Sequence, residues 1–414
     1  MMAPVLPFTE WVFIGLCCLA TCYAAVAALV RSGSRDAADA LETGHRQAAS
    51  HPSPVSVLKP LCGAEPRLFE NLQTFCTQTH PAFQLLFGVS SASDPAVAVV
   101  KKLRDAYPHL DIGIVIDSTA HGSNLKVGNL INLAARARHD HLVLADSDIA
   151  VDPDYLTRVT APLFDRNVGL VTCLYRARSI GDFWTRMGAL FIDEWFVPSV
   201  HVAHAAGSRR FGFGATLALR RDTLAASGGL EALRDSLADD YWLAEHVRAL
   251  GLATVLSDVV VTTDVVERDF ASLWRRETRW LRTIRSVNPL GFAFLFITFT
   301  SPWLIASALL GVGIDASGGN IAHSNADTLV DLSTSLGLSA RILLHWRTAR
   351  NWRRFWRDLP LVPLRDALLS LQWLASAFGT HVSWRGARIP VRGSGIVTGR
   401  SLSDVPDTSD LSDS

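Results

Sequence analysis

The sequence is poor in charge and carries no net charge. Only 19% of its 414 residues are Asp, Glu, Lys or Arg, and 39 basic residues balance 39 acidic ones. No overall electrostatic field therefore draws the chain to nucleic acid, and a nucleic-acid partner is not expected. Hydrophobic residues make up 49% of the chain, and the mean hydropathy is +0.22. This apolar excess is more than an ordinary soluble core needs, which makes a membrane segment the first explanation.

Cysteines are few, and their spacing excludes a disulfide framework or a cysteine-based metal motif. Cys17, Cys18 and Cys22 lie within one apolar run, and the other three are scattered along the chain. We expect all six to be buried, reduced thiols, which fits a reducing compartment.

An uncharged segment near the N-terminus predicts a transmembrane helix over residues 11–30. Its twenty residues are enough to cross a hydrocarbon core of about 30 Å. The segment lacks the basic start of a signal peptide and follows Glu10, which favours an uncleaved anchor. Basic residues from Arg31 onward follow it and none precedes it. The positive-inside rule therefore places residues 1–10 outside and the following chain in the cytoplasm.

The central part of the chain predicts an α/β domain. A linker over residues 31–54 precedes it, and short apolar runs then alternate with helical stretches over residues 55–286. The predicted strands are 55–61, 83–90, 112–116, 141–145 and 168–174, and the predicted helices are 66–75, 95–107, 125–137 and 153–164. This alternation favours a mainly parallel sheet, with ligand-binding groups gathered at the carboxyl ends of its strands.

The C-terminal third predicts further membrane helices. Residues 287–314 contain no charged residue before Asp315, and residues 328–346 form a weaker apolar run. We therefore expect two or three hydrophobic helices within residues 287–379.

The last of these apolar stretches, residues 359–379, contains Arg365 and Asp366. Either this pair is buried in a helix bundle, or the helix lies at the membrane interface instead of spanning it. We expect a basic segment over residues 380–392 and a disordered, Ser- and Asp-rich tail over residues 393–414.

Two carboxylates that directly follow an apolar strand are the sharpest ligand-binding signal. The run His141-Leu-Val-Leu-Ala ends at Asp146-Ser147-Asp148. Mg²⁺ and Mn²⁺ prefer oxygen ligands and need few from the protein when phosphates supply the rest. Asp146 and Asp148 are therefore the predicted metal ligands.

Three weaker signals each allow a structural and a functional interpretation. Asp94 precedes Pro95 and is either a helix N-cap or a ligand contact. Lys126 lies at a helix start, where it either meets a phosphate or joins a solvated face. Asp239 and Asp240 begin another helical pattern, where one of them is a general base or both complement the helix dipole.

A basic and aromatic sequence, Trp274-Arg-Arg276-Glu-Thr-Arg279-Trp280, lies just before the large apolar region. Its arginines can contact a bound anion or lipid phosphates. A juxtamembrane helix with an interfacial tryptophan is the structural alternative.

In chain order, these residues form one pattern. Asp94, Asp146-Ser-Asp148, Asp239-Asp240 and Arg276-x-x-Arg279-Trp280 resemble the D, D-x-D, D and (Q/R)-x-x-R-W series of inverting, processive-type glycosyltransferases. The chain is most similar to the ceramide glucosyltransferase family, through the segments Val57-Leu-Lys59-Pro60-Leu, Asn124-x-Lys126-x-x-Asn129-Leu130, Gly169-Leu170-Val171 and Ser383-Trp384-Arg385. The resemblance runs from about residue 55 to about residue 392.

This resemblance implies a GT-A-type domain that binds a nucleotide sugar, with a UDP-sugar as donor and a membrane lipid as acceptor. Asp94 would bind the uridine portion of the donor. Asp146 and Asp148 would hold Mg²⁺ or Mn²⁺ against the diphosphate. Lys126 and Asn129 would complete the donor-binding set.

The resemblance also implies the roles of the catalytic residues. Asp240 would be the base that takes the acceptor proton in a single, inverting displacement, and Asp239 is the alternative base. Arg276 and Arg279 would lie near the diphosphate, and Trp280 would line the path of the acceptor.

Several segments resemble the bacterial branch that contains the glycosyltransferase of hopanoid biosynthesis, among them Lys126-Val-Gly-Asn-Leu-Ile-Asn132 and Gly169-Leu-Val-Thr-Cys-Leu-Tyr175. That branch implies an integral protein of the bacterial inner membrane with its catalytic domain in the cytoplasm. The acceptor would be ceramide or a hopanoid polyol such as bacteriohopanetetrol, with glucose, N-acetylglucosamine or glucuronic acid as the sugar. The segment Asp193–Pro198 departs from the eukaryotic members, which carry a His near a Pro-Arg pair, and leaves the acceptor open.

Two other functions share part of this pattern. A polysaccharide synthase has the same acidic and arginine series but needs a membrane channel, for which three or four hydrophobic segments are few. A non-catalytic membrane protein that binds nucleotide sugar or lipid would be expected to lack a member of the series, and none is missing.

Overall fold

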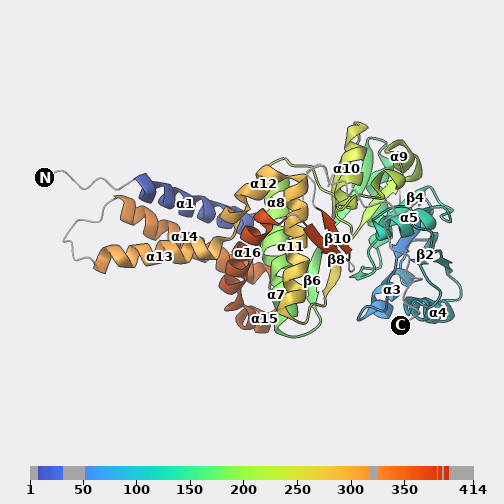
Figure 1. The fold of residues 1–414 in the computed structure, drawn as a ribbon, viewed down its shortest axis with the longest axis horizontal. Helices are drawn as coiled ribbons and strands as arrows, with labels where there is room; N and C mark the ends of the chain where they lie inside the picture. The colour runs from blue at the N-terminus through green and yellow to red at the C-terminus, as the bar shows by residue number, and fades with distance from the viewer. Residues whose placement is uncertain (1–7, 31–51, 317–324, 380, 385–386, 391–414) are drawn as a thin grey trace, which may run out of the picture.

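The computed structural model describes residues 8–30, 52–316, 325–379, 381–384 and 387–390. The molecule is elongated, with an α/β domain at one end, a layer of helices in the middle and a narrow helix bundle at the other end (Figure 1). The predicted linker up to residue 51, residues 317–324, most of the predicted basic segment and the predicted tail lie outside the described residues.

The α/β domain is built on one eight-stranded sheet with the strand order β3-β2-β1-β4-β7-β6-β8-β5. The strands are β1 (Val55–Pro60), β2 (Phe83–Val89), β3 (Asp111–Ile116), β4 (His141–Leu144), β5 (Ile149–Ala150), β6 (Val168–Ser179), β7 (Leu217–Arg220) and β8 (Ala253–Val265). Strands β3, β2, β1 and β4 are parallel, as are β6 and β8. Strands β7 and β5 run antiparallel to their neighbours. The α/β prediction is confirmed, with a sheet that is parallel in one half and mixed in the other.

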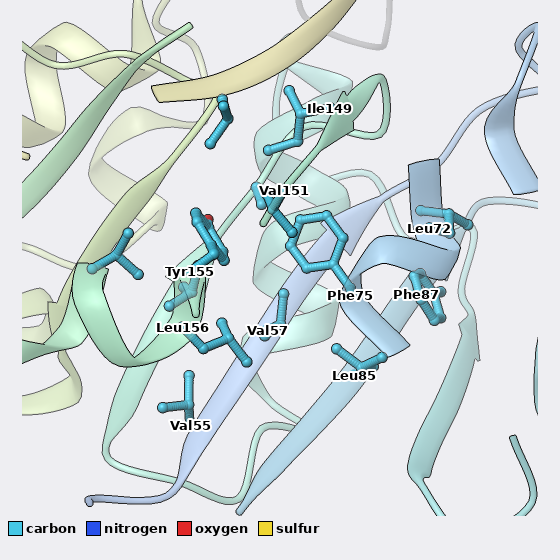
Figure 2. Close-up of a cluster of buried hydrophobic side chains, with 14 of the residues drawn as sticks. Val55, Val57, Leu72, Phe75, Leu85, Phe87, Ile149, Val151, Tyr155 and Leu156 are labelled. Carbon is cyan, nitrogen blue, oxygen red and sulfur yellow. The ribbon is translucent and has the colours of Figure 1, made fainter. Parts of the chain in front are cut away.

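Successive residues of the central strands face opposite sides of the sheet, so each side buries its own core. Val57 packs under α3 (Leu68–Cys76) and α4 (Ala96–Ala106). Its neighbour Leu58 packs under α5 (Leu125–Ala134) and α10 (Asp239–Ala249). Figure 2 shows Phe75 of α3 lying close to Val57 on the first side, and its ring meets that of Tyr155 edge-on at 5.6 Å.

Two predicted elements end four or more residues away from the residue expected. Strand β6 continues to Ser179 instead of residue 174, because its second half pairs with Val260–Val265 of β8, a strand distant in sequence. The predicted helix over residues 153–164 is α6 (Tyr155–Thr160) followed by a 3₁₀ turn, Ala161–Phe164. Pro162 has no N–H to continue the α-helical hydrogen bonding.

The middle layer consists of helices packed around an aromatic and aliphatic core. Its helices are α7 (Phe183–Phe191), a π-helical turn (Ile192–Phe196), α8 (Val197–Ala205), α11 (Phe270–Val287), α12 (Pro289–Phe294), α15 (Trp352–Asp358) and α16 (Leu361–Phe378). Helix α9 (Arg221–Ala226) belongs to the α/β domain, and β9 (His381–Trp384) and β10 (Ala387–Pro390) form a separate hairpin.

The narrow bundle consists of α1 (Phe8–Leu29), α13 (Thr300–Ala316) and α14 (Asn325–Thr348), which lie side by side (Figure 1). Within α1, Trp11–Leu29 is long and apolar enough to cross a membrane, and most of it is not buried by the chain. Among the described helices, Pro289–Thr298 and Thr300–Leu309 meet that standard only when taken together, and they are bent by 47° at their junction. The predicted N-terminal helix is confirmed as a helix, whereas the C-terminal region contains a single bent candidate.

Arg365 and Asp366 of α16 are buried among packed helices, which was one of the two alternatives for this pair. Asp366 pairs with Arg341 of α14 at 3.1 Å, and Arg341 also pairs with Glu194 at 2.7 Å. Arg365 pairs with Glu277 of α11 at 2.9 Å. All five side chains are buried, so these ion pairs link the bundle, the π-helical turn and α11.

Replacement of Arg341 by leucine is expected to destabilise the protein strongly. Arg341→Leu would leave Glu194 and Asp366 buried without their shared cation, a change that costs about 3–5 kcal/mol. Thermal unfolding of the detergent-solubilised protein, followed by circular dichroism, should show a clearly lower melting temperature. The control Ile342→Val, at a neighbouring position that is 40% exposed, should melt close to the original protein. Equal melting of the two variants would contradict the account of this network.

Candidate active site

The candidate site lies at the carboxyl end of β4, where helices α5 and α10 begin. Asp146 follows β4, Lys126 lies in the first turn of α5, and Asp239 and Asp240 begin α10. Asn124 joins two of these ends, because its side chain caps α5 through Val127 N and donates to Asp239 Oδ1 at 3.2 Å. The fold therefore brings the predicted residues of three separate sequence segments together.

Lys126 is the cation at the centre of this group. Its Nζ lies 2.7 Å from Asp146 Oδ1 and 3.7 Å from Asp239 Oδ2. Burial opposes the charge on Lys126, but the negative charges of Asp146, Asp239 and Asp240 outweigh this effect and raise its pKa. Lys126 is thus held as a fixed positive charge that joins the Asp146 side of the site to the α10 side.

Gly214 lies between these charged groups, although sequence reasoning did not identify it. A Cβ atom at this position would lie 2.9 Å from Lys126 Nζ, 3.2 Å from Asp146 Oδ2 and 3.4 Å from Asp240 Oδ2. Its N–H donates to Asp240 Oδ2 at 2.8 Å. Only a residue without a side chain leaves the space between the three groups open.

The structure separates the two neighbouring carboxylates of α10. Asp239 forms an ion pair with Lys126 and accepts a hydrogen bond from Asn124. Asp240 accepts the backbone N–H groups of Gly214 and Tyr241, each at 2.8 Å. Burial and the charge of Asp239 raise the pKa of Asp240 to about 6, although Lys126 acts in the opposite direction. A raised pKa near neutrality suits a general base better than that of an ordinary aspartate.

Asp146 and Asp148 form a donor set that fits a divalent cation. Burial, together with the charges of Asp146 and Glu65, raises the pKa of Asp148 to about 7. Asp148 Oδ2 accepts from Thr263 Oγ1 at 3.1 Å, which orients its carboxylate. Carboxylate oxygens are the ligands that Mg²⁺ and Mn²⁺ prefer, although Asp146 Oδ1 already pairs with Lys126. Within the described residues no group of three His, Cys, Asp or Glu side chains is arranged to hold a metal, so further ligands would come from the donor.

Lys59 is a second buried lysine, and it lies beneath the loop that carries Asp146. The sequence motif contains Lys59 but predicts no role for it. Its Nζ donates to the Asp146 carbonyl at 2.6 Å and lies 3.7 Å from the centre of the Phe75 ring. Burial lowers the pKa of Lys59 to about 7, against the opposing effect of Asp146 and Asp148. Lys59 therefore supports the loop that carries the predicted metal ligands.

Two residues predicted to bind the donor make hydrogen bonds to the protein backbone. Asp94 accepts from Gly63 N at 3.0 Å and from Ala96 N at 2.8 Å, so it joins the loop after β1 to the start of α4. Asn129 Nδ2 donates to the Gly88 carbonyl of β2 at 2.8 Å. These bonds give Asn129 a role in holding α5 against the sheet, while the partly exposed Asp94 still borders the loop at the end of β1.

The two arginines of α11 differ in their partners. Arg276 pairs with Glu267 at 2.6 Å and with Glu277 at 3.4 Å, and it lies over the Trp280 ring at 5.7 Å. The guanidinium of Arg279 has no hydrogen bond or ion pair within the part of the chain that the structure describes. Burial and Arg276 lower the pKa of Arg279, whereas the charges of Asp146 and Asp240 raise it. Arg279 therefore faces the same group of carboxylates as an unpaired cation.

An aromatic wall borders the site beside Asp240. Trp280 lies 6.1 Å from Tyr175 and 5.9 Å from Phe196, measured between ring centroids. Tyr175 stacks on Phe196 at 5.2 Å, and Phe213, which precedes Gly214, lies 5.5 Å from Phe196. Phe213 directly precedes Gly214, whose N–H donates to Asp240, so this wall and the carboxylate are close. Burial and the charge of Asp240 raise the pKa of Tyr175. Only Trp280 of this wall was predicted from the sequence.

A methyl group at Gly214 is expected to disrupt the site. Gly214→Ala would force Lys126 away from Asp146 at a cost of about 1–3 kcal/mol, and UDP binding, which the sequence predicts, should weaken about tenfold or more. Calorimetric titration of UDP in the presence of Mn²⁺ would measure the change. The control is Gly128→Ala on α5, where a new Cβ would lie 3.7 Å from its nearest neighbour, the His121 backbone nitrogen. Equal UDP affinity of both variants would show that Gly214 does not border the donor site.

Two curated relatives and one solved structure illustrate what the chain is similar to. It is 26% identical over 236 residues to ceramide glucosyltransferase 1 of Caenorhabditis elegans, covering 57% of this chain and 50% of the relative. It is 30% identical over 138 residues to a ceramide glucosyltransferase of Komagataella phaffii, covering 32% of this chain and 26% of the relative. A mannosyltransferase of Pyrobaculum calidifontis, solved in complex with GDP-Man and Mn²⁺, is 17% identical with a TM-score of 0.45, over 87% of this chain and 97% of that structure.

These relatives confirm the resemblance to the ceramide glucosyltransferase family, and the chain spans half or less of their length. The family model described as glycosyl transferase family 21 matches residues 12–397. That range includes most of α1, the whole α/β domain and the helical layers. The chain therefore belongs to glycosyl transferase family 21.

Proposed function

We propose that this chain transfers one sugar from a UDP-sugar to a hydroxyl group of a membrane lipid, with inversion at the anomeric carbon. The observation that carries the proposal is the convergence of Lys126, Asp146 and Asp240 around Gly214, beside the aromatic wall. Donor-side charges and a candidate base thus share one small space. The family match supports the same reaction class.

In the proposed reaction, the donor binds along the edge formed by β1 and β4. Asp94 borders the uridine, and Lys126 supplies positive charge to the diphosphate. A Mg²⁺ or Mn²⁺ ion held by Asp146 and Asp148 would act as a Lewis acid and neutralise the negative charge of the diphosphate. Lys59 maintains the position of the Asp146 carbonyl and with it the loop.

Asp240 is the proposed base. Its carboxylate takes the proton of the acceptor hydroxyl while that oxygen forms a bond to the anomeric carbon. The bond from the anomeric carbon to the UDP oxygen breaks, and its electron pair leaves with UDP. Arg279, which is unpaired among the described residues, stabilises the negative charge that develops on the departing diphosphate. Arg276 is a positioning residue, because Glu267 and Glu277 hold its guanidinium.

The aromatic wall and the apolar helices together favour a lipid acceptor. The wall formed by Tyr175, Phe196, Phe213 and Trp280 joins the site to the helical layer, from which the apolar bundle extends. A lipid hydroxyl could thus reach Asp240 while its tail stays in apolar surroundings. Ceramide is the first acceptor to test, since the curated relatives are named ceramide glucosyltransferases, and a hopanoid polyol is the second.

The same arrangement supports an inner-membrane enzyme whose catalytic domain lies in the cytoplasm. Helix α1 would act as the anchor, because Trp11–Leu29 is long and apolar enough to cross the bilayer. The basic residues that follow α1 and α14 favour the cytoplasmic side.

The proposal is tested by product analysis with the purified full chain. Detergent-solubilised protein would be incubated with Mn²⁺ and separate UDP-sugars, with ceramide or bacteriohopanetetrol as acceptor, and products would be identified by mass spectrometry. We expect one sugar per lipid and loss of product with EDTA. A product with several sugars would indicate a polysaccharide-synthase-type reaction. Absence of any glycolipid product would refute lipid glycosylation.

Removal of the charge at Asp240 is expected to reduce turnover by about a hundredfold or more, the usual contribution of a general base. Asp240→Asn should keep its affinity for UDP, because Lys126 and Asp146 are unchanged. The matched control Asp239→Asn removes a carboxylate that pairs with Lys126, so it should weaken UDP binding more and turnover less. A larger loss of turnover in the Asp239 variant would transfer the role of base to Asp239.

The pH dependence of kcat/KM is expected to report the raised pKa of Asp240. The base acts in its charged form, so kcat/KM should fall as the pH drops through about 6. An unshifted aspartate would give this decline near 3.8. Asp239→Asn removes one cause of the raised pKa, so its decline should move to lower pH. A decline that stays in place would exclude Asp240 as the titrating group.

A further inference from the structure

A second pocket, distinct from the candidate active site, lies where α7, the π-helical turn, α14 and α15 meet. It has a cavity volume of about 120 Å³, and none of the candidate catalytic residues lines it. Its charged lining consists mainly of Arg186, Arg350, Arg354, Arg357, Glu194 and Asp358, with Asp193 beside them. The proposed transfer reaction assigns no role to this pocket.

The acidic residues of the pocket are already neutralised by other partners. Glu194 pairs with Arg341 at 2.7 Å and accepts from His345 at 2.8 Å. Asp358 pairs with both Arg186 and Arg357. Glu194 and Asp358 are therefore already paired, and neither neutralises the other arginines that line the pocket.

Arg350 and Arg354 are those remaining arginines. Neither forms an ion pair or a side-chain hydrogen bond within residues 52–316 and 325–379, and both are exposed. Burial, and then the charges of Arg176 and Arg354, lower the pKa of Arg350. Asp193 acts on Arg350 from within the pocket, but burial raises the pKa of Asp193 to about 7, and its Oδ1 already accepts from Ala177 N at 2.9 Å. The pocket thus holds uncompensated positive charge.

The pocket also lies at the end of the narrow bundle that adjoins the middle helical layer. Arg347 in the last turn of α14 donates to carbonyl groups at the end of α1, Ala28 and Val30. Helix α15 is attached to α14 through a contact of His345 Nε2 with the Phe355 carbonyl at 3.0 Å. Arg350 and α15 therefore lie near the C-terminal end of α1. Figure 1 shows α15 beside α7.

Helix α15 presents aromatic side chains beside the pocket. Trp352 and Trp356 are each 64% exposed, and their rings stack at 6.0 Å. Exposed tryptophans next to arginines are typical of a segment at a membrane–water interface, where anionic lipid headgroups are available. Guanidinium groups match the oxygens of phosphate better than any other common side chain.

We propose that this pocket binds a phosphate-type anion through Arg350 and Arg354, either the headgroup of an anionic phospholipid or free phosphate. This site is separate from the donor site, and the proposal does not depend on the transfer reaction. It gives the arginines that follow α14 a specific ligand in addition to their general attraction to a charged surface.

Native mass spectrometry of the detergent-solubilised full chain would test the proposal. Dioctanoyl phosphatidylglycerol would be titrated, with dioctanoyl phosphatidylcholine as the zwitterionic comparison and inorganic phosphate as competitor. The double variant Arg350→Ala with Arg354→Ala should bind phosphatidylglycerol about tenfold more weakly. The matched control Arg353→Ala changes an exposed arginine of the same helix that does not line the pocket, and it should bind like the original protein.

The competition arm identifies the source of the anion. Retention of phosphatidylglycerol that millimolar phosphate does not displace supports a lipid headgroup, whereas displacement by phosphate supports a free anion in the same pocket. Equal binding of phosphatidylglycerol and phosphatidylcholine would overturn the proposal. Original affinity in the double variant, or an equal loss in Arg353→Ala, would also overturn it. A melting temperature measured for each variant separates lost binding from lost folding.

Discussion

The ion pair between Lys126 and Asp146 is the interaction on which the rest of the site depends. It joins α5 to the end of β4 at 2.7 Å and extends to Asp239 at 3.7 Å. Four carboxylates at one sheet edge would repel one another without a fixed cation, because their pairwise energies rise as burial lowers the local dielectric constant. Lys126 offsets this repulsion and so permits Asp240 to stay close to the donor side of the site.

A second electrostatic connection joins the catalytic edge to the apolar helices. Glu277 of α11 is buried between Arg365 and Gln372 of α16, at 2.9 Å and 2.8 Å. The adjacent residue, Arg276, and the nearby Arg279 and Trp280 lie on the side of α11 that faces the candidate site. Helix α11 therefore fixes the aromatic wall relative to the bundle, which suits an enzyme whose acceptor approaches from a membrane.

Much of this arrangement was predictable, and the rest depends on contacts between distant segments. The apolar strand that ends at Asp146 and the charge-free run in α1 are local patterns, and both predicted elements form. Gly214 was not identified, because its importance arises only when the antiparallel strand β7 places it between Lys126 and Asp240. The sequence also did not show that Arg276 is paired whereas the Arg279 side chain is not. That difference arises because Glu267 and Glu277 both pair with Arg276, and the spacing of residues in the sequence does not reveal these contacts.

The role of Lys126 can be measured directly through the acid limb of the kcat/KM profile in a Lys126→Met variant. If Lys126 holds Asp240 in its charged form, loss of the lysine should raise the pH at which residual activity declines by about one unit or more. A decline at the same pH as in the original protein would contradict the central claim that this lysine couples the two sides of the site.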